Sequence, residues 1–95
     1  MKELAQKYLD DLKNVKNELD SVSLELEKMR NNDVVDVDKY EELYAYEFEL
    51  SITLHGIYEE IERIIQNPKF NESEFVIYKL KKDADKIFKP IVLGK

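Results

Sequence analysis

The chain has no cysteine or tryptophan, and only two glycines, two prolines and one histidine among its 95 residues. Without cysteine, disulfides, zinc–thiolate centres and thiol nucleophiles are excluded. The lack of a second histidine excludes a multi-histidine metal site. Few helix breakers, with 43% hydrophobic and 38% charged residues, favour a folded helical chain over a disordered one. The length predicts a single domain over residues 1–95.

Long apolar runs are also lacking. No run approaches the roughly 18 residues that a membrane span needs, so no membrane partner is expected. The charged start of the chain does not resemble a signal peptide, and the expected location is the cytoplasm. The sequence contains no glycine-rich phosphate loop and no G-x-S-x-G motif, and we expect no cofactor.

Charge is unevenly distributed within a net charge of −6. Residues 31–67 hold ten acidic and two basic side chains, whereas residues 68–95 hold seven lysines and four acidic side chains. The acidic middle would repel phosphates, which argues against a chain that contacts nucleic acid along its whole length. Steps of three and four place four lysines on one helix face, although a solvated face is the commoner reason for such spacing. These candidate nucleic-acid contacts are Lys79, Lys82, Lys86 and Lys89.

Hydrophobic periodicity predicts three helices, at about 2–30, 38–66 and 73–89. In the first, apolar residues alternate at steps of four and three: Tyr8, Leu12, Val15, Leu19, Val22, Leu26 and Met29. The second has a matching seam: Tyr40, Leu43, Glu47, Leu50, Leu54, Ile57, Ile61 and Ile64. The third has an apolar face of Phe75, Val76, Leu80, Ala84, Ile87 and Phe88. Two long helices and a short connection predict an all-α fold, in which a long antiparallel hairpin packs with a shorter third helix. We expect this three-helix bundle to dimerise.

Capping residues set the expected helix ends. Asp38 is the expected N-cap of the second helix, and Pro68 should stop that helix. Asn71 or Ser73 should cap the third helix, which should end before Pro90.

The second helix is apolar around most of its circumference, more than its two neighbours can cover. Tyrosine is common in interfaces because its ring is apolar and its hydroxyl tolerates water. We therefore expect a homodimer or a protein partner at this helix. The candidate interface residues are Tyr44, Tyr46, Phe48, Ile52 and Gly56.

The lone histidine and one glutamate need separate interpretations. His55 is either a general base or a core histidine bonded to Ser51 or a neighbouring tyrosine, and the structural role is favoured. Glu47, in the seam of the second helix, should pair with a lysine of the first helix or with a group across a dimer interface, because an unpaired buried carboxylate is costly. The metal-binding Glu-x-x-His pattern is absent, and Asp33, Asp36 and Asp38 lack the other elements of a calcium loop, so no metal is expected.

The stretch Leu54–Ile64 reads Leu-His-Gly-Ile-Tyr-Glu-Glu-Ile-Glu-Arg-Ile. It resembles the central helix of HepT-like proteins of the HEPN superfamily, and the resemblance covers about residues 4–66. It implies a dimerising helical bundle from a toxin–antitoxin module with a nucleotidyltransferase-like partner. The family's ribonuclease motif, Arg followed after four to six residues by His, is absent. The resemblance thus implies a catalytically silent or truncated relative, with Leu54, His55, Tyr58, Glu62 and Arg63 in structural or interface positions.

Three functions follow from these observations. The leading one is a non-enzymatic, HepT-like interaction module that self-associates and binds a protein partner. The second is an RNA-binding protein or ribonuclease that uses His55, Arg63 and the four lysines. The third is an acidic inhibitor, borne by a phage or mobile element, that presents residues 33–62 to a nucleic-acid-binding protein.

Overall fold

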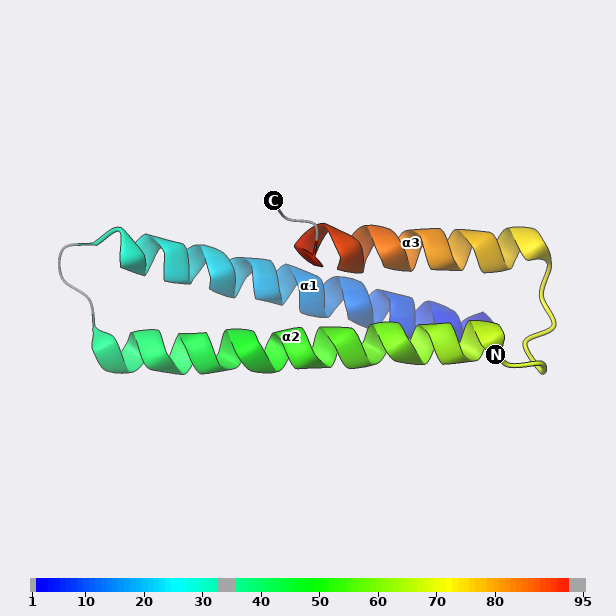
Figure 1. The fold of residues 1–95 in the computed structure, drawn as a ribbon, viewed down its shortest axis with the longest axis horizontal. Coiled ribbons are helices and arrows are strands. Elements are labelled where there is room, and N and C mark those ends of the chain that lie inside the picture. Colours follow the sequence, from blue (N-terminus) through cyan, green and yellow to red (C-terminus); the bar gives the residue numbers. More distant parts are fainter. Residues whose placement is uncertain (1, 33–35, 93–95) are drawn as a thin grey trace.

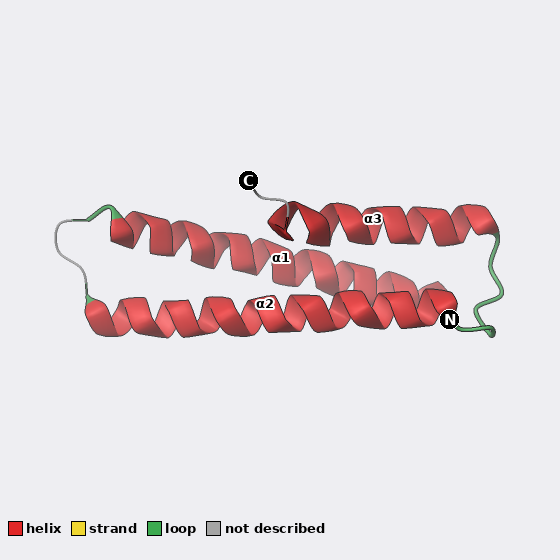
Figure 2. Ribbon diagram, viewed as in Figure 1, coloured by secondary structure: helices red, strands yellow, loops and turns green. Residues whose placement is uncertain are grey.

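The chain folds as an all-α bundle (Figure 2). The computed structural model describes the backbone of residues 2–32 and 36–92, and the side chains of these residues up to Phe88. This part of the chain forms three helices, α1 (Lys2–Arg30), α2 (Val37–Gln66) and α3 (Glu74–Val92). Helices α1 and α2 lie antiparallel along their whole length, as the two matched seams predict (Figure 1). The bundle is elongated, with Cα atoms spanning 55 × 22 × 15 Å.

The start of α2 differs from the prediction. Its N-cap is Asp36, whose Oδ1 accepts a hydrogen bond from the backbone N–H of Lys39 at 3.2 Å. Asp38, the predicted cap, lies in the first helical turn. Asp36 has an extended backbone, which lets its side chain reach back to the third residue of the helix, and Asp38 is already helical. The predicted end at Gln66, before Asn67-Pro68, is confirmed.

Helix α3 begins where one of the two predicted caps lies. Ser73 Oγ accepts a hydrogen bond from the N–H of Val76 at 3.3 Å, so Ser73 rather than Asn71 is the cap. The helix continues through Pro90 to Val92, and the predicted end at Lys89 was wrong. The fixed φ of proline is compatible with a helix. A helix can therefore continue a few residues past a proline, although it loses one backbone hydrogen bond because proline has no N–H.

The core follows the predicted seams with additions. The buried residues are Ala5, Leu9, Leu12, Leu19, Val22, Leu26, Leu50, Leu54, Tyr58, Ile61, Ile64, Phe70, Leu80 and Ala84. Ala5 and Leu9 lie off the predicted seam of α1, and they are buried because α3 packs on this part of α1 from a second direction. Phe75 was predicted to be in the core but is 72% exposed. Five residues at about 100° each place it roughly 140° around α3 from Leu80.

The third helix divides the hairpin into two halves (Figure 1). Helix α3 runs beside the N-terminal half of α1 and the C-terminal half of α2, and it ends near the middle of the hairpin. Near this end, Phe88 stacks on Tyr58 with ring centroids 4.4 Å apart. We call residues 2–16 and 52–92 the three-helix half, and residues 17–32 and 36–51 the two-helix half. The two-helix half holds ten acidic and three basic side chains.

Candidate interaction surface

A row of apolar side chains lies on the outer surface of α2. Tyr44, Phe48 and Ile52 are 58%, 64% and 58% exposed, and they follow one another at steps of four. Gly56 continues the row, and we call these four residues the α2 ridge. Ile52 is two residues from both Leu50 and Leu54, which is about 200° around the helix from each. Since those leucines point into the core, the ridge faces away from it.

Gly56 leaves a notch in this surface. A Cβ placed on Gly56 would meet no described atom within 4 Å, so close packing inside the chain does not require a glycine. Glycine inside a helix costs about 1 kcal/mol relative to alanine. The notch belongs to a shallow hollow of about 350 Å³, lined by Ser51, Ile52, His55, Gly56 and Glu59. The surface beside Ile52 is therefore open to a side chain from another molecule.

Tyr46, the fifth predicted interface residue, is set apart from the ridge. Its hydroxyl donates a hydrogen bond to the Glu18 carboxylate of α1, and its ring is 37% exposed. This hydrogen bond, aided by desolvation and by the charges of Glu18 and Glu49, raises the pKa of Tyr46 above its usual value. Tyr46 thus links α1 to α2 within the chain.

His55 lies on the surface, and its predicted place in the core was wrong. The side chain is 59% exposed, with Nδ1 3.1 Å from Glu59 Oε1. Ser51, its predicted partner, instead donates a hydrogen bond from Oγ to the Glu47 carbonyl at 3.0 Å. The His55 ring tilts against Phe88 at a centroid distance of 5.5 Å, near the end of α3. This contact leaves more than half of the His55 side chain exposed.

Arg63, the other catalytic candidate, is not brought into a shared site with His55. Its Nη1 lies 2.5 Å from Glu60 Oε2, and its side chain is 67% exposed. Eight helical residues separate Arg63 from His55, which is about 12 Å along the helix. Each side chain contacts a carboxylate on its own turn of α2, and this arrangement does not form an acid–base pair.

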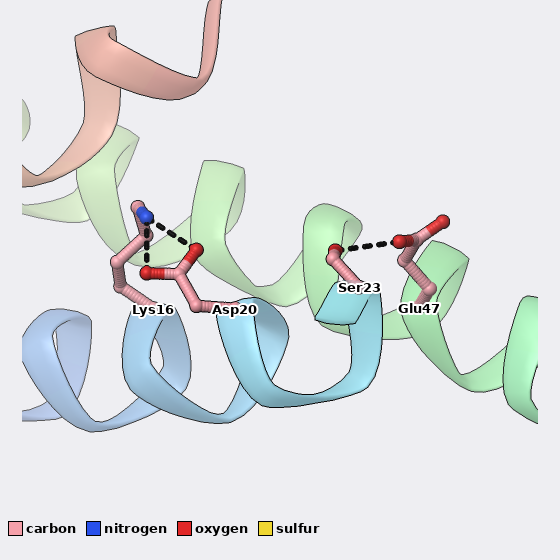
Figure 3. A network of polar contacts seen from close by, with 4 residues as sticks. All are labelled: Lys16, Asp20, Ser23 and Glu47. Atoms are coloured by element: carbon pink, nitrogen blue, oxygen red, sulfur yellow. Dashed lines mark hydrogen bonds and ion pairs between the residues drawn. The ribbon is translucent and has the colours of Figure 1, made fainter. Parts of the chain in front are cut away.

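Glu47 has a different partner from the predicted lysine (Figure 3). Ser23 Oγ of α1 donates a hydrogen bond to Glu47 Oε2 at 2.6 Å, in a partly buried position. Lys16 instead pairs with Asp20, one turn along α1, at 2.5 Å. Ser23 lies opposite Glu47 in the hairpin, whereas Lys16 lies about two turns away. A neutral hydroxyl therefore satisfies the seam carboxylate.

The outer face of α3 combines aromatic and basic side chains. Phe75 and Tyr78 are 72% and 64% exposed, and Lys82 Nζ lies 5.9 Å from the centre of the Tyr78 ring. Lys79 and Lys86 are exposed beside them, while the side chain of Lys89 lies outside the described part of the chain. Sequence reasoning identified the lysines but missed both aromatics. Phe75 lies four residues before Lys79, and Tyr78 four residues before Lys82, and this spacing is the signal that identifies them.

Two other kinds of site, a metal centre and a membrane-spanning helix, are absent from residues 2–32 and 36–92. Among these residues, no group of three or more histidine, aspartate or glutamate side chains is placed to hold a metal ion. None of the described helices has an apolar stretch of the length that a bilayer crossing requires. Comparison with protein-family models, curated proteins and solved structures gives no match. The HepT-like resemblance of residues 54–64 therefore stays a prediction.

Proposed function

We propose that this chain is a non-enzymatic protein-interaction module that self-associates and binds a protein partner through the α2 ridge. The observation that carries the proposal is a row of three large apolar side chains, each more than half exposed, on one side of one helix. Contiguous exposed apolar surface of this kind marks interaction sites in proteins. The HepT-like stretch, residues 54–64, lies on the same helix, and a HepT-like role with a nucleotidyltransferase-like partner is part of the proposal.

Magnitudes indicate a weak to moderate association. Full burial of a large apolar side chain contributes about 1.5–3 kcal/mol, and two copies would bury Phe48 and Ile52 twice over. Association costs on the order of 4–15 kcal/mol in lost translational and rotational freedom. Since the gain and the cost are of similar size, we expect self-association no tighter than the micromolar range.

The positions of the polar groups support a non-enzymatic role. His55 and Arg63, the catalytic candidates, are exposed, and each contacts its own glutamate on α2. An enzyme needs such groups to converge on one reacting atom. The exposed apolar row of Tyr44, Phe48 and Ile52 lies on the same helix.

Sedimentation equilibrium between about 1 and 300 micromolar tests the proposal. We expect concentration-dependent dimers for the native chain and monomers for Ile52→Glu, because the charge would be buried in the interface. Leu24→Glu is the matched control: Leu24 is a 53% exposed leucine on α1, away from the ridge, and its substitution should leave association unchanged. A native chain that stays monomeric throughout would contradict self-association.

RNA binding is the second candidate function, and the outer face of α3 favours it. Exposed aromatics stack on bases, and neighbouring lysines contact phosphates. Phe75 and Tyr78 lie among exposed lysines in this arrangement. Fluorescence anisotropy with a single-stranded RNA should give salt-dependent binding that weakens about tenfold in the Phe75→Ala, Lys82→Glu double variant. Lys28→Glu, at the far end of the bundle, is the control, and equal loss in both variants would contradict a site on α3.

A further inference from the structure

We propose that two copies of this chain pair through α2 in antiparallel orientation, about a two-fold axis at Ile52. Phe48 of each copy then packs into the Gly56 notch of the other. This inference rests on the proposed function and adds the partner and its geometry. It is carried by the positions of Phe48, Ile52 and Gly56 and by the charges that flank them.

A two-fold interface must be complementary to itself, since the same surface serves on both copies. In an antiparallel helix pair centred on Ile52, residues equally far from Ile52 on either side face each other. Phe48 and Gly56 are each four residues away, so the most exposed aromatic ring of α2 meets the position without a side chain. A Cβ at Gly56 would have no described atom of its own chain within 4 Å, so the notch is available to a second copy.

The charges on the outer face of α2 follow the same symmetry. Exposed residues line this face at steps of three and four: Glu41, Ala45, Phe48, Ile52, Gly56, Glu59 and Arg63. The middle of this line is apolar, and its two end residues carry opposite charges. Glu41 and Arg63 are each eleven residues from Ile52, so antiparallel pairing places them opposite each other. Parallel pairing would instead place Glu41 against Glu41 and Arg63 against Arg63, which is repulsive.

The Arg63 side chain can take this place opposite Glu41 of the second copy. Within its own chain it forms an exposed pair with Glu60, and such surface pairs are weak enough to exchange partners.

The charge of the two halves of the bundle favours this orientation at longer range. The two-helix half holds ten acidic and three basic side chains, whereas residues 2–16 and 52–92 hold ten acidic and eleven basic ones. Antiparallel pairing places the acidic half of one copy beside the neutral half of the other. Parallel pairing would bring two strongly acidic halves together, at a cost that low salt increases.

Site-specific cross-linking tests the orientation, and the absence of native cysteine makes it direct. Single-cysteine variants are treated with the short cross-linker bismaleimidoethane and separated on a denaturing gel. Ile52→Cys should cross-link to itself. Glu41→Cys and Arg63→Cys should each run as a monomer when treated alone. When the two variants are mixed, they should give a cross-linked dimer. Leu24→Cys, on α1, is the control that should stay single.

The outcomes separate this inference from the proposed function. Self-cross-linking of Glu41→Cys would indicate a parallel pair and overturn the geometry, while self-association would stand. The geometry would also be overturned if the chain sediments as a dimer but Ile52→Cys does not cross-link to itself. Monomers at every concentration would overturn both proposals.

The notch is tested by filling it. In Gly56→Leu the new Cβ meets no described atom within 4 Å, and leucine is a better helix former than glycine, so the folded monomer should be kept and its melting temperature should not fall. Dimerisation should weaken at least tenfold, because the leucine occupies the space of Phe48. Unchanged dimerisation with an intact fold would show that Phe48 does not use the notch. A charge exchange gives a second readout: Arg63→Glu should weaken the dimer, and added Glu41→Arg should restore it.

Discussion

The two halves of the bundle use the same helix differently. In the three-helix half, α2 contributes Tyr58, Ile61 and Ile64 to the core, where α1 and α3 cover it from two sides. In the two-helix half, Tyr44 and Phe48 of the same helix are mostly exposed. The difference arises from the length of α3, which ends near the middle of the hairpin (Figure 1). A short third helix thus leaves apolar surface on one half that the other half buries.

Each half also has a hydrogen bond that joins α2 to a neighbouring helix. In the three-helix half, the Tyr58 hydroxyl donates a hydrogen bond to the Asp85 carboxylate and holds α3 on α2. Burial, and then this bond, raise the pKa of Tyr58 well above its usual value. In the two-helix half, Ser23 and Glu47 join α1 to α2 in a partly buried position (Figure 3). Both hydrogen bonds are partly buried, and each joins a neighbouring helix to α2.

The largest expected effect compares equivalent leucines in the two halves. Leu9 and Leu26 are 2% and 1% exposed, in the three-helix and two-helix halves respectively. Replacement by alanine should cost about 3–4 kcal/mol at Leu9 and about 2 kcal/mol at Leu26, because two helices can close around a cavity more easily than three. Urea unfolding measures both free energies. A larger loss at Leu26 would contradict the difference in packing.

An intermediate effect concerns Tyr58 and alkaline pH. Its folded pKa lies above the unfolded value of about 10, so its contribution to stability is present below about pH 10 and is lost as the pH rises further. Tyr58→Phe should cost about 1 kcal/mol at pH 7 and make stability less sensitive to pH between 10 and 11.5. Urea midpoints at several pH values measure this. Tyr78→Phe, at an exposed tyrosine of α3, should change neither quantity, and an unaltered alkaline slope in Tyr58→Phe would contradict the role of Tyr58.

The smallest expected effect concerns the start of α2 in the two-helix half. Asp36→Ala should lower the free energy of unfolding by about 1 kcal/mol, because the N–H of Lys39 loses its acceptor. Asp38→Ala is the matched control and should cost less than about 0.5 kcal/mol, since its charge only interacts with the helix dipole. Thermal unfolding measures both losses of stability. A larger loss for Asp38→Ala than for Asp36→Ala would indicate that Asp38 is the N-cap, as the sequence predicted.

Much of the fold was predictable because helical periodicity is a local property. Leu12, Leu19, Leu50 and Leu54 lie on seams that the sequence reveals, and all four are buried. Phe75 was placed in the core by mistake, although its spacing, about 140° around the helix from Leu80, already turns it away from the buried side. The candidate surface was partly predictable: Tyr44, Phe48, Ile52 and Gly56 came from the sequence, and their alignment in one exposed row came from the structure.

By itself, the sequence determined the all-α class, the three helices and the antiparallel hairpin, because spacing, caps and loop length act within short stretches of chain. Tertiary structure alone decided which apolar faces stay exposed. His55 and Tyr58 are three residues apart on α2, yet the Tyr58 residue is 8% exposed and the His55 side chain 59% exposed. Both rings contact Phe88 of α3, but only Tyr58 stacks on it and also bonds Asp85, and these contacts depend on packing between residues far apart in the sequence. An apolar helix face is buried only where another helix reaches it.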